Sequence, residues 1–195
     1  MRLTMSKFFW SLAFTLAVVC TAAASTGDAE TALRGAVDEV LAVTQTSKGG
    51  VAMANKLEPI LLRRVCFESM TRRAVGPGWR QFTPGQREEA TRLFTKLIIR
   101  TYSDKFTPGE QPDIKYLKPS SPGAGKAEIP TSVVYKGSRY TVTYRLEDRG
   151  KWLITDILAE GVSLVANYRA QFDALVKKGG AVAVIDSLKQ SVGRT

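Results

Sequence analysis

The spacing of apolar residues changes twice along this chain, and these changes limit the folds that it can adopt. Between residues 33 and 105, apolar residues recur at every third or fourth position, which predicts amphipathic helices. Between residues 114 and 158 they recur at every second position, which predicts β-strands. From residue 164 to residue 192 the helical spacing returns. Helices followed by strands and then by helices indicate an α+β domain.

The strand region should fold as an antiparallel meander, because short connections separate its strands. The clearest strand carries Tyr140, Val142 and Tyr144 on one face and polar residues on the other. Pro130 indicates an edge strand or a bulge. Segment 119–125 is rich in glycine, serine and proline and is expected to be a loop. Strands are predicted over residues 114–117, 127–135, 139–146 and 151–158.

The helical regions carry recognisable start and stop signals. Thr83, Pro84 and Gln86 place a hydroxyl at the N-cap, proline at the first helical position and glutamine three residues after the cap. The glycine pairs at 49–50 and 179–180 should each end a helix. Residues 25–30 are small and polar, and we expect them to form a loose leader. The helices should wrap a curved sheet of four or slightly more strands, with either a filled core or an internal apolar pocket. Beyond the first helix, which starts near Leu33, helices are predicted over about residues 51–64, 67–74, 84–105, 164–178 and 181–192.

The N-terminus has the pattern of a cleavable export signal. Arg2 and Lys7 precede an apolar run over residues 8–19, which is too short to cross a bilayer. An A-x-A cleavage motif ends at Ala24. We therefore expect a signal peptide over residues 1–24 and a single exported domain over residues 25–195.

The two cysteines bear on this interpretation. A lipoprotein modified at Cys20 is disfavoured, because Val19 stands where a small residue is required. Cleavage near Ala24 would remove Cys20 and leave Cys66 as the only thiol. We expect Cys66 to be a small buried apolar side chain rather than a reactive one.

The chain has no histidine, which removes serine–histidine and cysteine–histidine catalysis and the common zinc motifs. Ser163 precedes a predicted helix and is expected to cap it. Asp156 lies within an apolar strand, where it could be a catalytic carboxylate with a raised pKa. The alternative, which we favour, pairs it with an arginine or with backbone amides. No catalytic residue, metal site or cofactor is predicted.

The net charge of +10 indicates an acidic partner but does not identify it. Most arginines between residues 63 and 100 should lie on the solvated faces of helices, and an exported protein rarely meets nucleic acid. We therefore expect no nucleic-acid partner. Anionic membrane surfaces or acidic protein complexes are the expected counter-charge.

Two blocks of sequence resemble a known family. Residues 152–172 read W-L-I-T-D-I-L-A-E-G-V-S-L-V-A-N-Y-R-A-Q-F, and residues 67–72 read F-E-S-M-T-R, followed by T-P-G-Q at residues 83–86. Both are similar to motifs of the MlaC family, the periplasmic phospholipid-binding proteins also called toluene-tolerance proteins. The resemblance covers roughly residues 30–190. It departs from the family pattern at Cys66, where an aspartate usually precedes the phenylalanine.

The resemblance implies a soluble periplasmic lipid carrier, not an enzyme, with a bound phospholipid as its ligand and no cofactor. Such a carrier shuttles phospholipid between an inner-membrane ABC lipid-transport complex and an outer-membrane lipoprotein–porin complex, and it approaches membranes only transiently. Asn167 and Arg169 would contact the head group or form a structural salt bridge to Asp156, and we favour the salt bridge. Apolar residues of the sheet and the facing helices should line the pocket or, alternatively, fill an ordinary core. These residues are Phe94, Ile98, Val133, Tyr135, Tyr140, Val142, Tyr144, Leu164 and Phe172.

Three other interpretations stay open from the sequence. The carrier could bind another lipid, such as a hopanoid. A small pocket of this kind could also serve an isomerase or hydrolase that uses Asp156 and a tyrosine, although the absence of histidine weakens this idea. An adaptor with a filled core would need no ligand at all.

Overall fold

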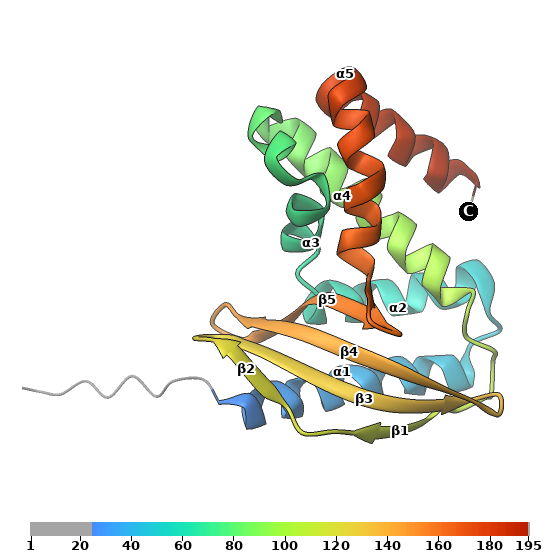
Figure 1. The fold of residues 1–195 in the computed structure, drawn as a ribbon. Helices are drawn as coiled ribbons and strands as arrows, with labels where there is room; N and C mark the ends of the chain where they lie inside the picture. The colour runs from blue at the N-terminus through green and yellow to red at the C-terminus, as the bar shows by residue number, and fades with distance from the viewer. Residues whose placement is uncertain (1–24, 195) are drawn as a thin grey trace, which may run out of the picture.

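A computed structural model describes residues 25–194, and the predicted signal peptide lies outside these residues. The described chain folds into helices, then an antiparallel sheet, then a long C-terminal helix, so the α+β prediction is confirmed (Figure 1). The helical elements are α1 (Thr26–Thr46), α2 (Gly50–Arg64), α3 (Phe67–Val75), the 3-10 helix η1 (Gly76–Gln81), α4 (Pro84–Ser103) and α5 (Leu164–Arg194). The strands are β1 (Asp113–Tyr116), β2 (Ser120–Gly123), β3 (Lys126–Tyr135), β4 (Ser138–Asp148), β5 (Trp152–Ala159) and β6 (Val162–Ser163).

The sheet has the order β1-β3-β4-β5-β6, and all its pairings are antiparallel, as the short connections predict. Strand β2 pairs with the first part of β3, while β1 pairs with the second part. The expected loop over residues 119–125 is therefore wrong, since Ser120 pairs with Glu128 and Gly123 with Lys126. Pro122 is tolerated because an edge strand needs backbone hydrogen bonds on one side only.

Two of the helix starts are fixed by side chains. Helix α4 begins as predicted, with the Thr83 hydroxyl accepting from the Gln86 amide and the Gln86 side chain accepting from the Thr83 amide. Helix α1 begins earlier than expected, because Ser25 and Asp28 form the same kind of capping box. The prediction of a loose leader over residues 25–30 is therefore wrong.

Glycine breaks the helical regions where the sequence indicates it. Helix α3 stops at Gly76, where the chain continues as the 3-10 helix η1. Within α5 the backbone leaves helical geometry at Gly179 and Gly180, where Gly180 has a φ of 58°. This kink separates the two predicted C-terminal helices and folds the last one back against α4 (Figure 1).

A bulge in β5 decides which side chains face inward. Arg145 of β4 pairs with Asp156, while the next residue of β4, Leu146, pairs with Ile154, so Thr155 is the additional residue. As a result Ile154 and Ile157 lie on the inner face of the sheet, and Asp156 lies on the opposite side. A regular strand would have placed Ile154 and Asp156 on the same face.

The apolar interior consists of two separate clusters. The sheet core joins α1 to the inner face of the sheet, and the bundle core joins α2, α3, η1, α4 and α5. In Figure 1, α3, α4 and α5 stand above β5, and α1 lies behind the sheet. No helix within residues 25–194 is long and apolar enough to cross a membrane. The sheet core contains Ala29, Leu33, Ala36, Ala127, Ile129, Leu146 and Ile154, and the bundle core includes Phe67, Met70, Phe94, Leu97, Ile98, Leu164, Phe172 and Leu188.

Candidate functional site

An apolar cavity of about 460 Å³ lies where the two cores meet. Its volume falls in the range of about 300–1,000 Å³ that is typical of ligand pockets. Residues of the bundle core line one side, and residues of the sheet core line the other. The lining comprises Ala36, Val37, Val40 and Leu41 of α1, Leu57, Leu61 and Arg64 of α2, Val65, Phe67 and Met70, Ile98, Ile99, Tyr102 and Ser103 of α4, Phe106, Pro112, Ile114, Val133, Val142, Tyr144, Ile154, Ile157 and Ala159 of the sheet region, and Val162, Ser163, Leu164 and Asn167.

The cavity is open to solvent at one end. Tyr102 and Val162 both line it, yet 43% and 64% of their surfaces are exposed. Ala159 and Asn167 are also exposed residues of the lining. These side chains come from α4, β5, β6 and the first turns of α5, so the opening lies at the sheet end nearest to β6. A long apolar molecule could therefore enter with one end and leave its other end in water.

Few polar groups face the cavity, and their environment keeps them uncharged or paired. Burial raises the pKa of the Tyr144 phenol to about 12, with a smaller contribution from Tyr116. The guanidinium of Arg64 donates a hydrogen bond to Glu39. That hydrogen bond holds the pKa of Glu39 below its ordinary value against the opposing effect of burial. The interior thus offers no unpaired charge from Arg64 to an apolar ligand.

The structure divides the sequence-predicted pocket residues into two groups. Ile98, Val133, Val142, Tyr144 and Leu164 meet in the lining of the cavity, and Asn167 stands at its opening.

Four other predicted residues do not line the cavity. Phe94 and Phe172 pack inside the bundle core, with ring centroids 5.9 Å apart, because α4 and α5 lie against each other there. The Tyr135 hydroxyl accepts a hydrogen bond of 2.9 Å from the Thr107 amide. Tyr140 is 44% exposed near the β3–β4 turn. These four residues follow the same periodicity as the lining residues but lie against other partners.

Sequence reasoning missed the contribution of the first two helices. The stripes through Val37, Val40 and Leu41 and through Leu57 and Leu61 were visible as helical periodicity. Their part in the cavity depends on how α1 and α2 cross the sheet, which the periodicity does not contain. Ile154 and Ile157 were missed for a related reason, since their common orientation depends on the bulge in β5.

Asp156 lies on the outer side of β5, where hydrogen bonds and an ion pair engage its carboxylate. Its carboxylate accepts hydrogen bonds from the Ser163 hydroxyl at 2.6 Å, the Val165 amide at 3.2 Å and the Ile157 amide at 2.9 Å. Arg145 pairs with it at 3.4 Å. Ser163 also accepts from the Ala166 amide at 3.0 Å, so the predicted cap of α5 is confirmed. The favoured pairing of Asp156 with arginine and backbone amides matches this arrangement.

Arg169 does not take the predicted partner. Its guanidinium pairs with Asp173 at 3.0 Å, one helical turn further along α5, and donates to the Arg73 carbonyl at 3.3 Å. The expected salt bridge to Asp156 is therefore wrong, because Arg145 reaches that carboxylate from the neighbouring strand.

Cys66 is half-buried and unpaired rather than fully buried, and its amide donates a hydrogen bond of 2.8 Å to the Ile154 carbonyl.

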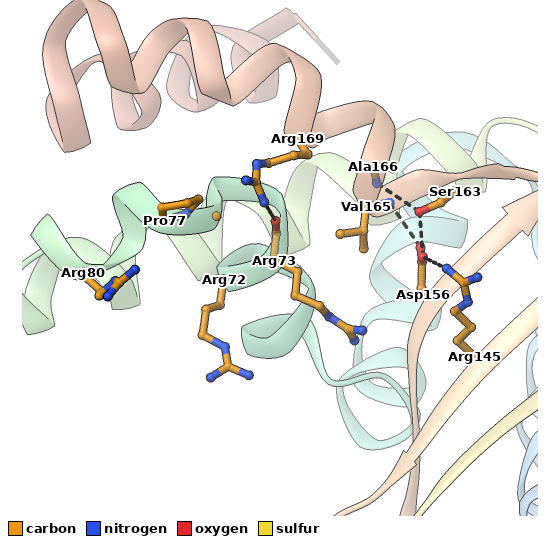
Figure 2. A pocket seen from close by; sticks show the side chains of 11 residues that line it. Arg72, Arg73, Pro77, Arg80, Arg145, Asp156, Ser163, Val165, Ala166 and Arg169 are labelled. Atoms are coloured by element: carbon orange, nitrogen blue, oxygen red, sulfur yellow. Dashed lines mark hydrogen bonds and ion pairs between the residues drawn. The ribbon is translucent and has the colours of Figure 1, made fainter. Parts of the chain in front are cut away.

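A second concave feature lies beside the cavity. A groove of about 630 Å³ runs between α3, η1 and the start of α5, and Figure 2 shows the arginines along it. Ser163 lines both the groove and the cavity. The two features are thus adjacent but differ in character, one apolar and one basic. The groove is lined by Arg72, Arg73, Gly76, Pro77, Arg80, Arg145, Asp156, Ser163, Val165, Ala166 and Arg169.

Comparison with known proteins gives a consistent result. A family model described as MlaC protein matches residues 34–190. A solved structure of a phospholipid-binding protein from Ralstonia solanacearum, in complex with a phospholipid, has the same fold with a TM-score of 0.79 and 25% sequence identity. The alignment covers 86% of this chain and 98% of that one. A search of curated protein sequences finds no match.

Proposed function

The chain belongs to the MlaC family, and on that premise we propose that it is a non-enzymatic carrier that holds a phospholipid by its acyl chains. The observation that carries the proposal is the open apolar cavity between the sheet core and the bundle core. The related Ralstonia protein, solved with a phospholipid, shares the fold that forms this cavity.

The energetics of the cavity suit a carrier. Burying an acyl methylene is worth about 0.8 kcal/mol relative to water, so two buried chains would gain roughly 20 kcal/mol. Lipid would therefore not leak into an aqueous compartment. A bilayer interior is equally apolar, so the cavity gains little over a membrane, and the direction of transfer must come from partners.

Within this function we propose roles for the residues of the lining. Ile98, Val133, Val142, Tyr144 and Leu164 would contact the acyl chains. The head group would remain at the opening, near Asn167 and the exposed Tyr102. Asp156 would support the wall from outside, since its carboxylate is engaged by the start of α5.

The wider cellular role belongs to the same proposal. We propose that the exported protein works in the periplasm, carrying phospholipid between an inner-membrane ABC lipid-transport complex and an outer-membrane lipoprotein–porin complex. The family membership and the predicted signal peptide support this setting. An adaptor with a filled core is disfavoured by the cavity, and an enzyme based on Asp156 is disfavoured because that carboxylate faces away from it.

Lipid analysis tests the proposal directly. The protein is purified from cells, extracted with organic solvent, and the extract is analysed by mass spectrometry. We expect phospholipid in a fixed ratio to protein, and the same protein after delipidation should reload from vesicles. A hopanoid would be recognised by its mass and would replace phospholipid as the ligand. Protein that is reproducibly lipid-free and cannot be loaded would refute the carrier function.

A further inference from the structure

The arginine-lined groove has no part in holding acyl chains, yet it gathers much of the positive charge of this face. Five arginines line it, and Asp156 is the one carboxylate among its lining residues. That carboxylate is almost fully buried and already accepts four hydrogen bonds, one of them from Arg145. The groove is therefore positively charged overall, although carboxylates outside its lining pair with three of its guanidiniums.

Three of the five guanidiniums are held in place. Arg73 donates to the Thr155 carbonyl at 2.9 Å and pairs with Glu147 at 3.5 Å. Arg145 pairs with Glu128 at 2.6 Å as well as with Asp156. These contacts fix the position of the charges and partly neutralise them.

The third is Arg169, which lies directly against the backbone of Gly76. A Cβ on Gly76 would stand 2.2 Å from the guanidinium carbon of Arg169, and Gly76 also has a φ of 70°. Only glycine combines this backbone conformation with so close an approach. Gly76 thus leaves the space that the guanidinium of Arg169 occupies in the groove.

The other two guanidiniums are available to a partner. Arg72 and Arg80 are exposed, and neither side chain has a hydrogen bond or ion pair with any residue of the described chain. Figure 2 shows them on either side of Pro77, pointing in different directions. A ligand could neutralise these two charges without breaking a hydrogen bond or ion pair of the folded protein.

We propose that this groove is a docking site for an acidic, extended polypeptide segment of a partner protein. The charges are spread from η1 to β4 rather than converging on one point, which suits a row of carboxylates better than a single phosphate. Pro77, Val165 and Ala166 supply apolar surface between the charges, which suits the side chains of a peptide.

The proposed docking site rests on the proposed function in one respect: a lipid carrier must recognise the proteins that supply and receive its lipid. Its position beside the cavity, with Ser163 common to both, would bring a docked partner close to the lipid. The positive groove would also accelerate association at low ionic strength.

Binding of a defined peptide tests the proposal. The probe is a short fluorescein-labelled peptide in which glutamate alternates with alanine and leucine, and its control carries glutamine in place of glutamate. Fluorescence anisotropy with the purified protein at low salt should show binding of the glutamate peptide and little binding of the glutamine peptide. Replacing both Arg72→Gln and Arg80→Gln should weaken that binding about tenfold, the combined effect expected of two exposed ion pairs.

A matched variant separates the groove from net charge. Lys115→Gln with Lys118→Gln removes the same charge from exposed positions at the β1 edge, outside the groove, and should leave the affinity within about twofold of the original. Arg72→Glu with Arg80→Glu should reverse the preference and bind a lysine version of the peptide. Phospholipid content measured on every variant should stay constant, so a loss of docking is distinguished from a failure of the carrier function.

Three results would overturn the proposal. Equal binding of the glutamate and glutamine peptides would show that carboxylates are not recognised. Equal losses in the two double variants would show that only net charge matters. Phosphatidylglycerol vesicles that bind through Arg72 and Arg80, and are not displaced by the glutamate peptide, would assign the groove to a membrane surface instead.

Discussion

Filling part of the cavity should weaken lipid binding without harming the fold. Val142 lies near the middle of β4 with its side chain in the cavity lining, where Val142→Trp would add a large apolar group. The tryptophan side chain has about seven more heavy atoms than the valine side chain, and each displaces roughly one acyl carbon. If half of these carbons are forced into water, lipid binding weakens by about 3 kcal/mol, or about a hundredfold.

The fold should tolerate this change because tryptophan suits a β-strand and the cavity offers it room. Its indole would cover apolar surface that is otherwise in contact with water, so the lipid-free protein should be as stable as before. The assay is the amount of phospholipid per protein, measured by mass spectrometry after purification and again after incubation with labelled vesicles.

Thr143→Trp provides the matched control. Thr143 precedes Tyr144 on the same strand, and its side chain points to the opposite face of the sheet, away from the cavity. This variant adds a similar side chain to β4 and should keep its lipid. If Val142→Trp retained as much phospholipid as Thr143→Trp, the assignment of acyl chains to this cavity would be wrong.

Three further predictions concern the groups around the cavity and the groove. The phenol of Tyr144 ionises near pH 12 in the folded protein and near pH 10.0 when unfolded, so its contribution to stability is complete below pH 10.0 and is lost as the pH rises toward 12. Tyr144→Phe should remove one late component from an ultraviolet titration of phenolate, and an unchanged curve would contradict this. Gly76→Ala should destabilise the protein by about 2 kcal/mol in urea unfolding, because residue 76 has a left-handed backbone and lies against the guanidinium of Arg169. Gly85→Ala is the control and should leave the stability unchanged, because the space around Gly85 is open. Asp156→Asn should cost about 2 kcal/mol of unfolding free energy, since it removes the charge of a buried carboxylate that accepts three hydrogen bonds from protein groups other than Arg145. The variant should keep its lipid content, and an unaltered urea midpoint would contradict a structural role for Asp156.

Much of the architecture could be read from the sequence because local rules fix it. The capping box at Thr83, the cap at Ser163 and the glycines at 179–180 depend on neighbouring residues only, and the structure has them where expected. The early start of α1 follows the same rule, but the small polar residues 25–30 also suit a leader, so the sequence pattern predicts the wrong alternative there. Strand β2 was missed because its pairing with β3 compensates for a sequence of poor strand formers.

The candidate site was harder to predict, and two residue pairs show why. Phe94 and Ile98 lie one turn apart on α4, yet Phe94 is enclosed by Tyr168 and Phe172 whereas Ile98 borders the cavity. Tyr140 and Tyr144 alternate on the same face of β4, yet only Tyr144 lines the cavity. Periodicity reports which face is apolar, but not whether protein or a ligand covers it.

That distinction is set by how the two cores are spaced. A chain of this length could bury all its apolar side chains in one cluster, and the sheet face and helical stripes provide enough of them. Here α1 packs on the sheet while α2 to α5 pack mainly on one another, so the facing surfaces meet only partly. The gap leaves both surfaces without the dispersion contacts that a filled core would provide. Acyl chains would supply those contacts and complete the interior, which couples lipid occupancy to stability by mass action. A protein built in this way favours the lipid-bound state in water. When a partner offers an equally apolar environment, the free energy of the lipid is similar in both places, so the lipid can be released.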